Sequence, residues 1–143
     1  SYLVDDKYLI SGDTVFIYSI GRPDLGGMAE EWSRMLFKTM TEKILNMDSG
    51  ISVLPGHYMD WQEADKSLTF VAPLGEIIDK NTAIYNIKNE KEFYAFIKTN
   101  MRQQPEEYAK IREINAGLVE VDEEKQDILD LGKNECAASA MGR

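Results

Sequence analysis

Two polar side chains that could bind a ligand stand at the ends of short apolar segments. Asp13 lies between two β-like runs in the stretch SGDTVFIYSIGRPDLGG, residues 11–27. His57 follows the apolar segment 51–54 and a Pro-Gly pair, and it is the single histidine of the chain. In open α/β sheets, ligands gather at the ends of strands. The sequence therefore singles out Asp13 and His57 as candidate site residues.

Each candidate also has a purely structural interpretation. Gly-Asp is a common turn pair, so Asp13 can be a turn residue between strands. His57 can be a loop histidine after the Pro-Gly turn. Spacing alone does not decide between these interpretations and a binding role.

The elements that would position these residues follow from hydrophobic periodicity. Residues 1–4, 7–10, 14–17 and 51–54 are predicted strands, and Asp5-Asp6 is a predicted polar turn. Apolar residues recur at helical spacing over 28–47, which is expected to be core, although its methionines could form a protein-binding face. Further helices are predicted at 74–80, 90–101 and 105–115. This order indicates a layered α/β fold.

Composition excludes several classes of partner. The chain has 143 residues, 43% of them hydrophobic, which is consistent with one domain. Its formal net charge of −9 argues against nucleic acid and against an anionic membrane surface. No apolar run approaches the roughly 20 residues that span a bilayer. The one cysteine, Cys136, precludes an internal disulfide and, with seven methionines, suits a cytoplasmic location.

Two segments carry a family resemblance. Residues 11–27 resemble the "TGD-T-L-F…G-R-x-D" segment of the metallo-β-lactamase fold, and VLPGHYMDW (residues 53–61) resembles its later Pro-Gly-His motif. The similarity is greatest to the glyoxalase II and persulfide dioxygenase branch. Residues 105–118 also resemble the helical tail of that branch. The resemblance covers most of the chain.

The resemblance implies that Asp13 and His57 are late metal ligands. It implies zinc or iron as the metal, and a hydrolase or dioxygenase acting on a glutathione thioester or persulfide. The residue types agree, because a carboxylate and an imidazole suit zinc or ferrous iron. Arg22 would line the mouth of the site near an acidic substrate, unless it forms an internal ion pair with Asp24. Tyr58, with Trp61, would contact substrate, unless both only pack.

The earlier ligands of the family, a His-x-His-x-Asp-His motif and one more histidine, are absent. We therefore expect the chain, residues 1–143, to be a single C-terminal half of an αβ/βα sandwich, with one mixed sheet covered by helices. Residues 1–57 would carry the ligand motifs, and 58–143 would be a mainly helical tail. The isolated chain is expected to be inactive and to hold no metal or adventitious metal. Its expected partner is the missing N-terminal half of the fold.

A non-catalytic alternative also stands. A half-sandwich exposes the sheet face that would pack on its twin, and a large apolar patch favours a partner. Two copies could then form a homodimer through that face, or the face could bind another protein.

Overall fold

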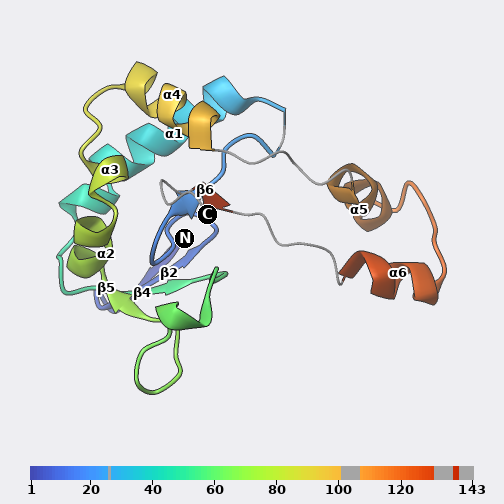
Figure 1. Ribbon diagram of the computed structural model, residues 1–143, viewed down its shortest axis with the longest axis horizontal. Helices are drawn as coiled ribbons and strands as arrows, with labels where there is room; N and C mark the ends of the chain where they lie inside the picture. Colours follow the sequence, from blue (N-terminus) through green and yellow to red (C-terminus); the bar gives the residue numbers. More distant parts are fainter. Residues whose placement is uncertain (26, 101–106, 131–136, 139–143) are drawn as a thin grey trace. The chain divides into compact units, whose positions relative to one another are not determined.

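The computed structural model describes residues 1–25, 27–100, 107–130 and 137–138 (Figure 1). The chain separates into two compact units, Ser1–Met101 with Cys136–Arg143, and Arg102–Glu135. Cys136, and residues 101, 105 and 106 of the predicted helices, lie outside the described residues.

A mixed four-stranded sheet, in the order β1-β2-β4-β5, is the centre of the first unit. Its strands are β1 (Tyr2–Val4), β2 (Tyr8–Gly12), β4 (Ser52–Pro55) and β5 (Ala72–Pro73). β1 and β5 run antiparallel to their neighbours, whereas β2 and β4 are parallel. The predicted α/β class with one mixed sheet is therefore confirmed.

The turn between β1 and β2 is the predicted polar one. Asp5 and Asp6 have φ values of 51° and 52°, and the amide of Lys7 donates to the carbonyl of Val4 at 3.0 Å. Two successive residues with positive φ give a turn whose twist matches that of its strands, and residues 5–7 lie between the paired Val4 and Tyr8.

Helix α1 (Ala29–Glu42), extended by the 3₁₀ turn η1 (Ile44–Asn46), connects β2 to its parallel neighbour β4. Parallel strands need such a crossover. Of the apolar residues predicted at helical spacing over 28–47, some are buried and others are exposed in the structure. Met40 and Ile44 are buried, while Trp32 and Met35 are exposed, so only some of these residues belong to the core.

The predicted strand at 14–17 is wrong. Val15, Phe16 and Ile17 are buried, but the segment is a tight loop in which Phe16 N donates to Ser19 O and Val15 bridges Ile20. A short buried apolar run cannot be told from a strand by its pattern alone. The two-residue strand β3 (Ile20–Gly21) follows and pairs with β6 (Ala137–Ala138).

Three helices complete the first unit: α2 (Leu74–Lys80), α3 (Thr82–Tyr85) and α4 (Glu90–Asn100). The positions of α2 and α4 were predicted, whereas α3 was not. Helix α4 lies beside α1 (Figure 1), where the rings of Phe37 and Phe93 are 5.4 Å apart. Buried residues from the strands and helices form one apolar core: Leu9, Val15, Ile17, Ile20, Met40, Ile44, Ile51, Val53, Ala72, Leu74, Ile77, Ile84, Tyr85, Phe93 and Ile97.

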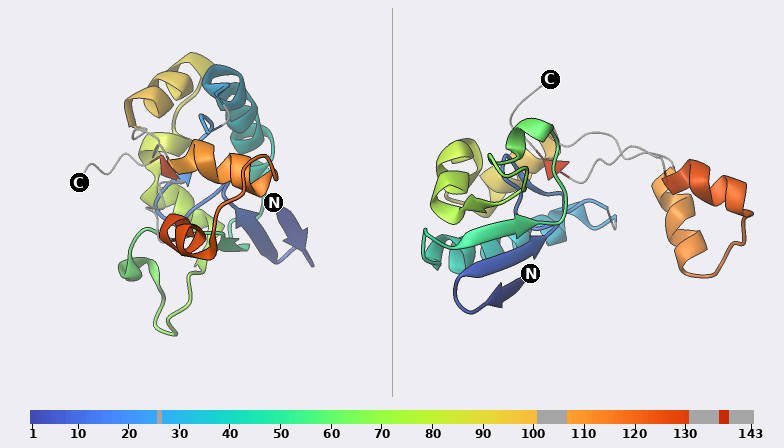
Figure 2. Two further views of the ribbon diagram at one scale, coloured as in Figure 1. Left: turned by 90° about the vertical axis from the view of Figure 1, so that its right-hand side faces the viewer. Right: turned by 90° about the horizontal axis from the view of Figure 1, so that it is seen from below.

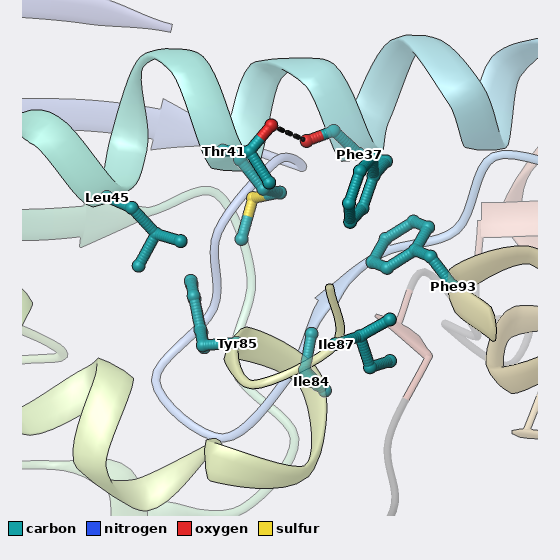
Figure 3. A pocket seen from close by; sticks show the side chains of 8 residues that line it. Phe37, Thr41, Leu45, Ile84, Tyr85, Ile87 and Phe93 are labelled. Carbon is teal, nitrogen blue, oxygen red and sulfur yellow. Dashed lines mark hydrogen bonds between the residues drawn. The ribbon is translucent and has the colours of Figure 1, made fainter. Parts of the chain in front are cut away.

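A small pocket lies within this core, between α1 and the segment that runs from α3 to α4 (Figure 3). Apolar side chains form most of its wall. The hydroxyl of Thr41 donates back to the carbonyl of Phe37 at 2.9 Å. The buried hydroxyl of Tyr85 has no hydrogen-bond partner within the described part of the chain, and burial raises the pKa of Tyr85.

The second unit contains α5 (Glu107–Asn115) and α6 (Glu123–Asp130), drawn in orange in Figure 2. Gly117, at φ 70°, ends the first of these helices, and Leu118 N donates to Glu113 O at 2.9 Å. This is the usual left-handed helix termination. The α5 prediction is confirmed over 107–115, and α6 was not predicted. Among the described residues, no helix is long and apolar enough to cross a membrane.

Candidate functional site

The parallel pairing of β2 with β4 brings the two sequence candidates together. Gly12 lies opposite Pro55 in the register, so both strands end at the same edge of the sheet. Asp13 follows the first strand and His57 follows the second by two residues. The amide of Gly56 donates to the carbonyl of Gly12 at 2.9 Å and joins the two strand ends.

Asp13 and His57 are in direct contact. The Nδ1 atom of His57 lies 2.6 Å from Oδ1 of Asp13, and the two side chains remain 40% and 52% exposed, respectively. An ionised carboxylate can only accept, so Nδ1 is the donor and carries the proton. The Nε2 lone pair is then left for another partner. The ring of Phe16 flanks the imidazole, with centroids 6.4 Å apart.

A tight turn holds Asp13 in place. Thr14 N donates to Ser11 O at 3.1 Å, and the buried Ser11 hydroxyl donates to Val15 O at 2.7 Å. The Ser11 hydroxyl also lies 3.3 Å from the carbonyl of Leu54 on β4, which ties the turn to the neighbouring strand. Sequence reasoning missed Ser11. A small hydroxyl residue just before a strand-end Gly-Asp pair was the available signal.

The side chains of Asp13 and His57 are of types that bind metals, but two ligand residues are too few to form a metal centre. Two atoms bound to one ion at about 2.1 Å lie about 3 Å apart or more, so the 2.6 Å contact is a hydrogen bond and not a coordination geometry. No cluster of three or more His, Cys, Asp or Glu suited to a metal occurs in the described ranges. Asp13 and His57 can therefore supply only part of a ligand set.

Arg22 is placed in the loop beyond Asp13. Its side chain is only 1% exposed and forms a two-pronged ion pair with Asp24, with Nε–Oδ1 at 2.8 Å and Nη2–Oδ2 at 2.7 Å. This is the internal ion pair that the sequence left open. A bidentate buried pair stiffens the loop. Contact of Arg22 with substrate stays a prediction.

The segment after His57 carries an aromatic cluster. The Tyr58 ring stacks on Phe70, with centroids 3.7 Å apart and an interplanar angle of 6°. The Trp61 ring packs against both rings in a tilted orientation, with centroid distances of 5.3 Å and 5.6 Å. Tyr58 and Trp61 are 43% and 68% exposed. Both residues thus pack and are accessible, and a substrate contact of Tyr58 stays a prediction.

Buried Glu63 orders this segment. Its Oε1 accepts from the amides of Met59 at 2.8 Å and Asp60 at 3.1 Å, while Oε2 is buried without a hydrogen-bond partner among the described residues. Asp60 and Glu63 form a capping box around the 3₁₀ turn η2 (Trp61–Glu63). Sequence reasoning missed Glu63, although its spacing from Asp60 is a known signal of a helix start.

No protein-family model matches the chain. A stretch of 53 residues, 37% of the chain, is 42% identical to an uncharacterized protein of Mycobacterium leprae (strain TN). A crystal structure of a metallo-beta-lactamase from Staphylococcus aureus subsp. aureus COL is similar over 82% of the chain, at 27% identity and a TM-score of 0.62. The matches span 23% of the first relative and 33% of the second. The structural similarity supports the metallo-β-lactamase superfamily and its hydrolase fold; the glyoxalase II-like branch is not tested by it.

Proposed function

We propose that this chain is the C-terminal part of a metal-dependent enzyme of metallo-β-lactamase fold, and that it contributes Asp13 and His57 to the metal centre. One observation carries the proposal. The two residue types that bind zinc or iron meet at 2.6 Å where two parallel strands end, and both side chains are accessible. The similarity to a metallo-beta-lactamase, of which the chain spans a third, supports the same conclusion.

Each residue has a distinct part in this proposal. Through Oδ1, the Asp13 carboxylate orients the imidazole and keeps its proton on Nδ1. The proposed ligand atoms are then Oδ2 of Asp13 and Nε2 of His57. When bound, zinc or iron would supply Lewis-acid chemistry at this edge of the sheet. The remaining ligands would come from an N-terminal half of the fold, since the described residues hold no third ligand beside the pair.

The proposed substrate is a glutathione thioester or a glutathione persulfide. Its support is the resemblance of residues 11–27 and 53–61 to the glyoxalase II and persulfide dioxygenase branch. A hydrolase would release glutathione and an acid from the thioester, whereas a dioxygenase would consume oxygen with the persulfide. Assaying the purified enzyme for both reactions therefore separates the two activities.

The experiment that tests the proposal is metal analysis of the longest natural protein that contains this chain. We expect the wild type to bind about one or two metal ions per chain, and Asp13→Ala and His57→Ala to bind at least tenfold more weakly. Asp79→Ala is the matched control, because Asp79 is an exposed carboxylate on α2. Unchanged metal content in Asp13→Ala and His57→Ala would refute the proposal.

A second candidate function is self-association through the sheet. Four side chains share one face of the β1–β2 hairpin, as the pairs Tyr2↔Ile10 and Val4↔Tyr8 show, and they are 41–76% exposed. An apolar sheet face of this kind favours a second layer, here proposed to be the same face of another copy.

Sedimentation of the isolated chain tests this candidate. We expect a dimer at about 10 µM that Ile10→Lys converts to a monomer, because a charge would be buried at the contact. Leu68→Lys is the control, since Leu68 is 75% exposed and lies outside the sheet. A wild-type monomer at that concentration would rule the dimer out.

A further inference from the structure

Gly56 packs closely against Asp13, one of the two site residues, and precedes the other in the sequence. A Cβ atom built on Gly56 would lie 2.9 Å from Oδ1 of Asp13, and 3.1 Å and 3.2 Å from the C and Cα atoms of Gly12. Side-chain Cβ atoms essentially never approach another atom closer than 3.0 Å. The carboxylate oxygen that accepts from His57 therefore lies where a side chain of residue 56 would begin.

Space, and not backbone conformation, is what requires glycine here. The glycines with positive φ among the described residues are Gly12, Gly27 and Gly117, and Gly56 is not one of them. An alanine could therefore adopt the backbone angles of Gly56, and its methyl group would meet the Asp13 carboxylate and the backbone of Gly12.

We propose that Gly56 is a positioning residue: its missing side chain lets the Asp13 carboxylate reach Nδ1 of His57 and so sets the tautomer and direction of the imidazole. The inference rests on the proposed function only in assigning Asp13 and His57 to a metal centre. Its argument is geometric, because the same Oδ1 atom is both the acceptor at 2.6 Å and the atom nearest to the absent Cβ.

The mechanism of positioning is a proton assignment. With Oδ1 in place, the proton of the neutral ring is held on Nδ1, and Nε2 keeps a free lone pair directed away from Asp13. A methyl group on residue 56 would displace Oδ1, and the ring would lose the acceptor that selects this tautomer. The ligand atom would then be protonated in a large share of the molecules.

The tautomer can be measured directly, because His57 is the single histidine of the chain. Two-bond ¹H–¹⁵N NMR correlation at pH 8, where a free imidazole is neutral, reports which nitrogen carries the proton. A hydrogen bond to a carboxylate should favour the Nδ1–H form by about tenfold relative to Asp13→Ala. We expect Gly56→Ala to show the ratio of Asp13→Ala.

Gly75→Ala is the matched control for crowding. Its new Cβ would lie 3.1 Å from the Cβ of Ser49, a similar approach that involves neither Asp13 nor His57. This variant should keep the wild-type tautomer ratio. A Gly56→Ala ratio within about threefold of wild type, or a wild type that already shows the Asp13→Ala ratio, would overturn the inference.

A double variant keeps the test decisive if Gly56→Ala does not fold. Removing the carboxylate in Asp13→Ala/Gly56→Ala leaves the new methyl group only its contacts with Gly12, so we expect the double variant to melt at a higher temperature than Gly56→Ala. Equal melting temperatures would show that the conflict is with the backbone alone and would overturn the inference. Neither measurement involves metal or substrate, so a failed metal assay would leave this result intact.

Discussion

Asn81 provides the sharpest test of how the loop that follows Asp13 is held. It is buried at the junction of α2 and α3, and its Nδ2 donates to Ile17 O at 2.9 Å and to Ile77 O at 2.7 Å. The first bond joins residues 64 positions apart in the sequence. Asn81→Ala removes both bonds and leaves the buried Ile17 carbonyl without this donor.

The expected cost follows from these contacts. The bond to Ile77 is worth about 1 kcal/mol, because that carbonyl still accepts from the Asn81 amide, and the stranded Ile17 carbonyl costs about 1–3 kcal/mol. Asn81→Ala should therefore lose about 2–4 kcal/mol of unfolding free energy. Asn81→Asp should lose more, because a carboxylate would face two carbonyl oxygens in the core. Urea unfolding followed by circular dichroism measures both losses.

Asn46 is the matched control. Its Nδ2 also donates to two carbonyls, those of Thr41 at 3.0 Å and Glu42 at 3.1 Å, but the side chain is exposed. Water can replace these bonds, so Asn46→Ala should cost less than about 1 kcal/mol. If Asn46→Ala and Asn81→Ala have equal costs, burial of the Ile17 carbonyl is not what makes Asn81 important.

Three further predictions concern single positions. Gly21→Ala should prevent folding or cost about 3 kcal/mol or more, because its Cβ would lie 1.8 Å from the carbonyl oxygen of Asp13; a melting temperature within a few degrees of wild type would contradict this. Burial raises the pKa of Tyr85 above its ordinary value of 10.0, so the phenol ionises in the unfolded state before it does in the folded state. Above pH 10.0 the free energy of unfolding should therefore fall by up to about 1.4 kcal/mol per pH unit. Tyr85→Phe should abolish that decline in urea unfolding at pH 9–11, and parallel curves for the two proteins would disprove it. Asp6→Gly should raise stability by about 0.5–1 kcal/mol in thermal unfolding, because Asp6 has a φ of 52°, and a loss would show that the Asp6 side chain matters more than its backbone.

Local patterns determined much of the fold from the sequence alone. The β1–β2 hairpin, α1, β4 and α2 were all predicted within a few residues, since alternation, helical spacing and turn residues act over short distances. The same patterns placed Asp13 and His57 after strands. The motifs around them also indicated the metallo-β-lactamase fold that the structural similarity supports.

Tertiary structure alone decided how these parts meet. No local pattern states that β2 and β4 are parallel neighbours, and that pairing is what brings Asp13 to 2.6 Å from His57. Residues 14–17 had a strand-like composition but form a loop, and the carbonyl of Ile17 in this loop accepts from Asn81, 64 positions away in the sequence. The space that Gly56 leaves for the Asp13 carboxylate likewise exists only once both strand ends are side by side. Contacts between distant segments depend on packing of the whole unit, which no short window of sequence contains.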